Sequence, residues 1–217
     1  MIIETMGRRR ATSYTKALLH FDMNRTDDVG NTWVNDGTSP YFTVSGKFDG
    51  CVYNILDTSN GALSCTDQVK DLTLTNGDFT VDCWAKNYGN TNYPADIFGN
   101  GTSAGMTFRI YTSYGKIIVY FYDGTYYSYT STSALNSSTW VHVSFVRSGI
   151  NNYLFMNGIL EIFESSSNLI SPSGYPQIAR VLSAPSSHGI YIDELRISSI
   201  ARWTSDFTPP TAPYTLD

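Results

Sequence analysis

Phe79-Thr80-Val81-Asp82-Cys83-Trp84-Ala85-Lys86 is the stretch that decides the fold class. Its residues alternate between two sides: Phe79, Val81, Cys83 and Ala85 on one, and Thr80, Asp82, Trp84 and Lys86 on the other. A period of two with one apolar side is typical of a β-strand that packs one face on a core. The stretch therefore predicts a sheet that covers a hydrophobic core.

The rest of the chain repeats short apolar segments, separated by clusters of Gly, Asn, Ser and Asp. Residues 153–156 are joined to 159–162 by Asn157-Gly158, and Asp123-Gly124 leads into 126–129. Both dipeptides readily supply the positive φ angles of a tight hairpin turn. Amphipathic helix patterns are nearly absent, and about a dozen short strands are expected, within the range for two stacked sheets. The sequence thus predicts one all-β domain, a two-sheet antiparallel β-sandwich.

Charge argues against one class of partner. The 217 residues carry a net charge of −5, with a pI near 5.1. Nucleic-acid binding needs clustered Lys and Arg to neutralise phosphates, so we expect no nucleic-acid partner. The one basic cluster, Arg8-Arg9-Arg10, is expected to be a short solvated arm or to dock on an acidic partner.

No segment indicates secretion or membrane insertion. The N-terminus, Met1-Ile2-Ile3-Glu4, lacks the apolar stretch of a secretion signal, and the longest apolar run, 117–122, is far too short to span a bilayer. The three cysteines, Cys51, Cys65 and Cys83, have irregular spacing. This spacing predicts free, mostly buried thiols rather than disulfides or a zinc site. We therefore expect a soluble protein made in the cytosol.

Several segments, taken in order, resemble the laminin-G-like jelly roll of the concanavalin A-like lectin/glucanase superfamily, a domain found in many phage and bacterial surface proteins. The matching segments are KALLHFD (16–22), GKFDG (46–50), GDFTVDCW (77–84), WVHV (140–143), LFMNG (154–158), YIDELRI (191–197), ARW (201–203) and FTPPTAP (207–213). The resemblance implies a laminin-G-like sandwich over residues 16–207. A basic arm at 1–15 precedes it, and an extended, proline-rich tail at 208–217 follows it.

Asp193 is the most informative polar residue. It shares strand parity with Tyr191, Leu195 and Ile197, which predicts that its carboxylate points toward the core, where an unpaired charge is costly. In related jelly rolls an aspartate at this position often helps to hold a structural calcium ion. The resemblance thus implies Ca²⁺ as a cofactor with Asp22 and Asp193 as metal ligands, completed by backbone oxygens and water. The alternative is a hydrogen-bonded aspartate with no metal.

No catalytic group is indicated. His20 and His142 lie in expected strands beside apolar neighbours, which favours structural histidines. The laminarinase-type glucanases of the family that this chain resembles use a compact Glu-x-Asp-x-x-Glu run for retaining hydrolysis. This run is absent here. Asp193 and Glu194 are adjacent, so a regular strand directs them to opposite faces. We expect a protein that is not an enzyme, and a glycoside hydrolase is the least favoured alternative.

The middle of the chain is rich in tyrosine, which occurs 16 times in all. Sheet packing explains any single tyrosine, but aromatic faces with hydroxyl rims also suit sugar rings and protein interfaces. The ligand-binding candidates are Trp33, Tyr93, Tyr114, Tyr126 and Tyr127.

These features together predict a non-catalytic binding or adhesion module. The chain ending that resembles the family is common in phage and virion proteins, and cytosolic synthesis followed by lysis would explain why the sequence shows no secretion signal. We therefore expect a virion-surface protein, in a tail fibre or capsid decoration, that recognises host surface glycan. The alternative is a purely structural protein that contacts other virion proteins. The protein is expected to act either as a monomer or as a homo-oligomer, because the sequence contains no heptad segment that would indicate a coiled-coil oligomer.

Overall fold

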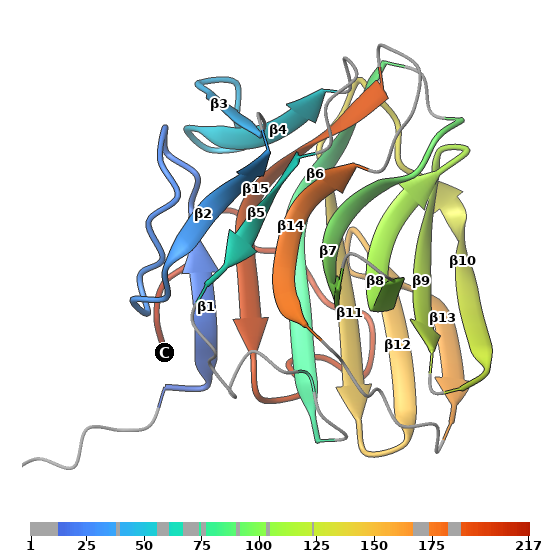
Figure 1. The fold of residues 1–217 in the computed structure, drawn as a ribbon. Helices are drawn as coiled ribbons and strands as arrows, with labels where there is room; N and C mark the ends of the chain where they lie inside the picture. Colours follow the sequence, from blue (N-terminus) through green and yellow to red (C-terminus); the bar gives the residue numbers. More distant parts are fainter. Residues whose placement is uncertain are drawn as a thin grey trace, which may run out of the picture.

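The structure is a computed structural model in which two antiparallel β-sheets stack face to face (Figure 1). It describes residues 13–37, 40–55, 61–66, 74, 77–89, 92–102, 105–122, 124–166, 174–181 and 188–217. These residues contain no helix, and hence none long and apolar enough to cross a membrane. The arginine cluster at 8–10 lies outside the described residues.

The sheet drawn behind in Figure 1 has eight strands among the described residues. Seven follow the order β13 (Ile159–Ser165), β12 (Asn151–Met156), β11 (Val141–Ser148), β6 (Phe79–Gly89), β15 (His188–Ser198), β4 (Cys51–Ile55) and β3 (Tyr41–Thr43). The eighth, β1 (Thr15–Leu19), also pairs with β15.

The sheet drawn in front has seven strands in the part of the chain that the structure describes. Their order is β10 (Tyr126–Ala134), β9 (Lys116–Tyr122), β8 (Gly105–Ser113), β7 (Ala95–Thr102), β14 (Tyr175–Val181), β5 (Gly61–Cys65) and β2 (Trp33–Gly37). β14, β7 and β8 are visibly bowed (Figure 1). The two-sheet sandwich expected from the sequence is confirmed.

The core lies between the two sheets and is built from alternate residues of each strand. Phe79, Val81, Cys83 and Ala85 of β6 all enter it, as the period of two predicts. From the other sheet, Phe108, Ile110, Val119 and Phe121 meet them. The three cysteines are buried and none of them forms a disulfide, as expected.

Three strands were not expected from the sequence. β2 and β3 lie within residues 24–45, a stretch rich in polar residues, and β14 follows a Ser/Asn/Pro-rich stretch. All three are short or interrupted by Gly and Pro, so their alternation is too brief to recognise. Both Asn-Gly and Asp-Gly hairpins form between the expected strands, although Asp123 itself lies outside the described residues.

β15 is the strand that organises the eight-stranded sheet. One edge pairs with β6 along most of its length, while the other edge is shared, with β4 beside Gly189–Ile192 and β1 beside Leu195–Ser198. Between these two partners the register shifts at 193–196, and Glu194 has a φ of 54°. This β-bulge inserts an extra residue and breaks the strict alternation of side chains along β15.

The chain end, residues 199–217, is called the C-terminal segment below. It crosses the outer face of the eight-stranded sheet, where Trp203 and Phe207 pack near Phe155 and Tyr214 packs near Leu18 and Trp84. The Trp203 and Phe207 rings are stacked, with centroids 4.0 Å apart. Extended chain was expected at 208–217, and the structure shows in addition that Tyr214 is buried against the sheet.

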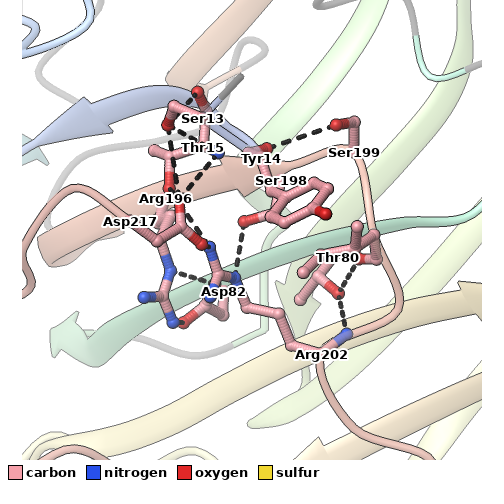
Figure 2. Close-up of polar contacts among 11 residues, drawn as sticks. Ser13, Tyr14, Thr15, Thr80, Asp82, Arg196, Ser198, Ser199, Arg202 and Asp217 are labelled. Atoms are coloured by element: carbon pink, nitrogen blue, oxygen red, sulfur yellow. Dashed lines mark hydrogen bonds and ion pairs between the residues drawn. The ribbon is translucent and has the colours of Figure 1, made fainter. Parts of the chain in front are cut away.

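The two ends of the described chain are tied together by polar contacts (Figure 2). The Asp217 carboxylate accepts hydrogen bonds from Thr15 N at 3.1 Å and Thr15 Oγ1 at 2.8 Å, and it forms an ion pair with Arg202 at 2.7 Å. Thr15 was assigned to the N-terminal arm as its last residue. In the structure it is the first residue of β1.

Candidate functional site

Trp33 was predicted to contact a ligand, and this prediction is wrong. The side chain is 3% exposed and lies in the core. Its Nε1 donates a hydrogen bond to Asp27 Oδ2 at 3.0 Å, and Asp27 also accepts from Leu18 N and Asn31 Nδ2. Because Trp33 belongs to an inward-facing position of β2 rather than to a loop, its ring is unavailable to a ligand.

Tyr126 and Tyr127 were both expected to contact a ligand, but adjacent strand residues face opposite ways. Tyr126 is 73% exposed and lies on the outer face of the seven-stranded sheet. Tyr127 packs against the core and stacks on Phe121, with centroids 5.4 Å apart. The prediction therefore fails for Tyr127, whose ring supports the inner face of the sheet.

Tyr126 is part of a row of outward tyrosines. Its ring centroid lies 4.7 Å from that of Tyr122, the residue opposite it in the β9–β10 hairpin, and 5.8 Å from that of Tyr120. Alternation in β9 places Ile117, Val119 and Phe121 in the core and so turns Tyr120 and Tyr122 outward. The pattern in residues 116–122 could have located these two tyrosines from sequence.

Arg109 and Tyr111 of β8 extend this row. Arg109 pairs in register with Tyr120, and its guanidinium lies 4.2 Å from the centre of the Tyr111 ring. The guanidinium is held in place because Arg109 Nε donates a hydrogen bond to Asp96 Oδ1 at 2.8 Å. We call these five outward residues, Arg109, Tyr111, Tyr120, Tyr122 and Tyr126, the tyrosine face.

The charges beneath the tyrosine face are balanced within the protein. Asp96 is fully buried, and burial raises the pKa of its carboxyl, an effect that Arg109 and Arg180 oppose. Burial also raises the pKa of the Tyr111 and Tyr120 phenols. These hydroxyls therefore stay protonated at neutral pH and act as neutral hydrogen-bond donors and acceptors.

Tyr93 and Tyr114 lie far from Tyr126. Tyr114 is 73% exposed in the turn between β8 and β9, whereas Tyr126 lies beside the other end of β9. Six residues of extended strand separate the two ends, a distance of roughly 20 Å. Tyr93 is half-buried just before β7, whose first residue, Ala95, pairs with Thr112 near the Tyr114 turn. The five predicted ligand residues thus do not form one rim.

The two expected calcium ligands do converge, on the loop formed by residues 46–50. Lys47 N and Phe48 N donate to Asp193 Oδ2 at 2.6 and 3.1 Å, and Gly50 N donates to Asp22 Oδ1 at 3.0 Å. The loop is tightly packed, since a Cβ on Gly50 would lie 2.6 Å from Phe21 O.

The orientation predicted for Asp193 is wrong. Tyr191 and Asp193 lie opposite Lys86 and Trp84 on the outer face of the eight-stranded sheet, while Leu195 and Ile197 enter the core. The bulge at 193–196 separates the two sets, so a single parity cannot hold across it. Asp193 is buried under the 46–50 loop, and burial raises the pKa of its carboxyl to about 7.

The surroundings of Asp22 and Asp193 fit Ca²⁺ only in part. Two carboxylates reach one loop, but the groups directed at them are N–H donors rather than further oxygen ligands. No group of three or more His, Cys, Asp or Glu that could hold a metal occurs within the described ranges. Backbone carbonyls and water would have to supply most of the six to eight oxygens that calcium takes.

The two strand histidines are both hydrogen-bonded within the fold. His142 is buried, and its Nε2 lies 2.8 Å from Tyr214 Oη and 3.5 Å from Asp82 Oδ2. His20 Nδ1 lies 2.7 Å from Glu194 Oε1, and Glu194 Oε2 accepts from Tyr214 N at 2.6 Å. Both histidines therefore help to bind the C-terminal segment to the eight-stranded sheet.

Comparisons with known proteins agree with this architecture. The sequence profile of the concanavalin A-like lectin/glucanases superfamily matches residues 57–206. No curated protein matches the chain in sequence.

Solved structures with this fold include toxin binding domains. The binding domain of Paraclostridial Mosquitocidal Protein 1 has a TM-score of 0.70 at 14% identity, and covers 85% of this chain and 48% of that one. The binding domain of botulinum neurotoxin DC, in complex with rat synaptotagmin II, has a TM-score of 0.67 at 11% identity over 87% and 48%. Botulinum neurotoxin type C, whose cell entry depends on interaction with two ganglioside molecules, has a TM-score of 0.63 at 10% identity over 85% and 47%. This chain thus spans about half the length of each of these chains.

Proposed function

Because the chain belongs to the concanavalin A-like lectin/glucanases superfamily, we propose that it is a non-catalytic binding module that recognises glycan through the tyrosine face. The observation that carries the proposal is the row of Tyr120, Tyr122 and Tyr126, whose rings contact one another on the solvent side of the seven-stranded sheet. The opposite sheet has much of its outer face covered by the C-terminal segment.

The chemistry of the tyrosine face suits a sugar. Contiguous aromatic rings offer flat apolar surfaces for the C–H faces of pyranose rings, and their hydroxyls can donate to and accept from sugar hydroxyls. Arg109 adds further N–H donors whose position is fixed by Asp96 and the Tyr111 ring. Binding costs little side-chain conformational entropy, because these side chains already contact one another in the unbound protein.

The structural neighbours support a binding role. Two are toxin binding domains, one of them in complex with rat synaptotagmin II, and a third is botulinum neurotoxin type C, whose cell entry depends on interaction with two ganglioside molecules. Since identity is only 10–14%, they supply the fold, and the ligand class proposed here rests on the tyrosine face.

We place the module on the exterior of a virion, in a tail fibre or capsid decoration, where it binds host surface polysaccharide. A structural virion protein would instead use its surface for neighbouring subunits. Co-purification with particles and silence on a glycan array would favour that second function. Release of reducing ends from mixed polysaccharides would reveal a glycoside hydrolase, and we expect none.

A glycan array that includes bacterial surface polysaccharides tests the proposal. Wild-type protein should bind a defined set of glycans, and Tyr126→Ala should weaken that binding about tenfold, the loss expected for ~1.4 kcal/mol of aromatic contact. Tyr14→Ala is the matched control, because Tyr14 is also an exposed tyrosine but precedes β1 in the other sheet. Equal losses in both variants, or none in either, would contradict binding at the tyrosine face.

A further inference from the structure

The outer face of the eight-stranded sheet is only partly covered by the C-terminal segment. Alternate residues of β6 face outward there. The first three contact the C-terminal segment or Arg196 of β15, which lies beneath it. Thr80 Oγ1 accepts from Arg202 N, Asp82 pairs with Arg196, and Trp84 clusters with Tyr214. The next two outward residues, Lys86 and Tyr88, lie beyond these contacts and are half-buried.

Aromatic rings gather around Lys86. Its Nζ lies 4.9 Å from the ring centre of Trp140 and 4.9 Å from that of Tyr191. Tyr88 meets Tyr191 edge-on with centroids 5.6 Å apart, and Trp140 lies 6.4 Å from Tyr191. Strand pairing causes this convergence, because Tyr191 is opposite Lys86 in register and Trp140 directly precedes β11, the other neighbour of β6.

A second lysine adjoins this group. Lys47 Nζ lies 4.1 Å from the Trp84 ring, and Trp84 is the residue two before Lys86 on the same face of β6. The position of Lys47 is fixed because its backbone N donates to the buried carboxylate of Asp193. We call these five half-buried residues, Lys47, Lys86, Tyr88, Trp140 and Tyr191, the lysine–aromatic patch.

Among the described residues, the ammonium groups of Lys47 and Lys86 contact aromatic rings rather than carboxylates. The net charge is −5, and Arg109, Arg196 and Arg202 all form ion pairs with carboxylates. Neither Lys47 nor Lys86 forms an ion pair with any residue that the structure describes; both ammonium groups rest over aromatic rings. A ring face attracts a cation but leaves it able to take an anionic partner from solvent.

We propose that the lysine–aromatic patch is a second carbohydrate site, specific for saccharides that carry a carboxylate, such as uronic or sialic acids. The rings of Trp140, Tyr88 and Tyr191 offer a surface for the sugar ring, and the ammonium groups of Lys86 and Lys47 pair with its carboxylate. Two lysines suit one or two acidic groups rather than a phosphate backbone, which needs a longer row of cations.

This site is independent of the tyrosine face. The two sheets are stacked about 10 Å apart and the two patches lie on their opposite outer faces, so one short oligosaccharide cannot contact both. A domain with both sites would bind two glycan chains at once, or two parts of one long chain, and would gain affinity from the second contact.

The test measures binding of sialyllactose and tetragalacturonate by titration calorimetry, with lactose and maltotetraose as their neutral counterparts. We expect wild-type protein to bind at least one acidic sugar, and to bind it more weakly as NaCl rises because exposed charges are screened. Lys86→Met keeps the apolar stem over Trp140 and removes the charge, so it should weaken acidic binding about fivefold or more while the fold is retained.

Tyr14→Ala, which changes an exposed tyrosine outside both the lysine–aromatic patch and the tyrosine face, is the control and should leave acidic binding unchanged. No acidic binding by wild type, equal affinity for the neutral counterparts, or full affinity in Lys86→Met would each overturn the proposal. Loss of array binding in Tyr126→Ala with intact acidic binding would separate the two sites. If glycan array binding fails altogether but the acidic sugars bind and respond to Lys86→Met, only the tyrosine-face proposal falls.

Discussion

Asp82 is the buried carboxylate on which the packing of the C-terminal segment depends. Arg196 donates to it twice, from Nε at 3.1 Å and from Nη2 at 2.9 Å, and His142 approaches it from β11. Burial alone would raise the pKa of this carboxyl, but Arg196 and His142 outweigh burial and hold it below its ordinary value. Asp82 is therefore charged at neutral pH and depends on Arg196 for compensation.

Removing that compensation should be costly. Arg196→Met leaves a buried charge without its partner, for which a loss of about 3–5 kcal/mol in the free energy of unfolding is typical. Urea denaturation followed by tryptophan fluorescence measures it. Arg25→Met is the control, because Arg25 is exposed and bonds only Asn35 in the described contacts, so its loss should stay within about 0.5 kcal/mol. Similar midpoints for the two variants would contradict this role of the ion pair.

His20 gives the fold a pH dependence on the alkaline side. Its hydrogen bond to Glu194 raises the pKa of the imidazole from 6.5 to about 9. Because the folded-state pKa is higher, protonated His20 stabilises the fold fully below pH 6.5, and this stabilisation is lost as pH rises to about 9. The pKa of Asp193, also raised, adds a further loss between about pH 4 and 7.

The window between pH 7.5 and 8.5 is the one in which His20 dominates, because Asp193 has largely titrated below it, and the buried Cys51 and Cys83 thiols, whose pKa values burial raises, lower stability mainly above about pH 9. We expect the free energy of unfolding to fall by about 1 kcal/mol across it in wild-type protein, and to fall much less in His20→Gln. Urea midpoints at half-unit pH steps provide the measurement. A slope that persists in His20→Gln would assign the pH dependence to another group.

At the residue scale, sequence reasoning located strands but not the environment of single side chains. Trp33 looked like a loop aromatic because β2 is too short to show alternation, and burial then reversed its role. Tyr120 and Tyr122 were within reach, since residues 116–122 alternate cleanly. Arg109 was not, because its position depends on a long-range contact with Asp96 of a neighbouring strand.

The β11–β12 and β12–β13 turns allow a matched test of how the C-terminal segment docks. Gly149 and Gly158 both have positive φ, 58° and 77°, and both connect hairpin strands of the same sheet. A Cβ on Gly149 meets nothing within 4 Å, whereas a Cβ on Gly158 would clash with the backbone of Phe207. Both sites disfavour alanine, but only Gly158 lies under the segment.

Gly149→Ala should cost about 1 kcal/mol, the ordinary penalty for a left-handed alanine. Gly158→Ala should cost at least about 2 kcal/mol more, since Phe207 and the stacked Trp203 must shift. The free energies of unfolding give this difference, and an increase in the quenching of tryptophan fluorescence by acrylamide reports that Trp203, one of four tryptophans, has become more exposed. Equal costs and equal quenching would show that the segment does not depend on this contact.

The expected calcium site lies where the partner of β15 changes from β4 to β1. If Ca²⁺ binds Asp22 and Asp193, protein purified without chelator should contain about one calcium per chain, and EDTA should lower its melting temperature. Elemental analysis and thermal melts make the test. A metal-free protein with an unchanged melt would reject calcium and leave Asp193 as a carboxylate held by the N–H groups of the 46–50 loop.

At the element scale, hairpins were predictable and long-range pairing was not. The Asn157-Gly158 turn fixes β12 beside β13 through local chemistry alone. The division of one edge of β15 between β4 and β1 joins segments that are far apart in sequence, and no local signal marks the bulge that makes it. The error in the parity of Asp193 follows directly from that bulge.

For the whole molecule, the arrangement of covered and uncovered faces determines which surfaces are available to ligands. The C-terminal segment occupies one part of the eight-stranded sheet, which leaves the tyrosine face and the lysine–aromatic patch on opposite sides of the sandwich. The family resemblance predicted the sandwich correctly because its motifs are local and occur in order. It could not predict the two faces, since outward residues are not constrained by the core.

The most direct test of a glycan-binding role is an amide chemical-shift map of isotope-labelled protein titrated with a neutral oligosaccharide selected on the array. Binding at the tyrosine face predicts that shifts concentrate at Arg109, Tyr111, Tyr120, Tyr122 and Tyr126, with the core strand β6 unaffected. Shifts confined to other surfaces, or no saturable shift with any selected glycan, would contradict the account.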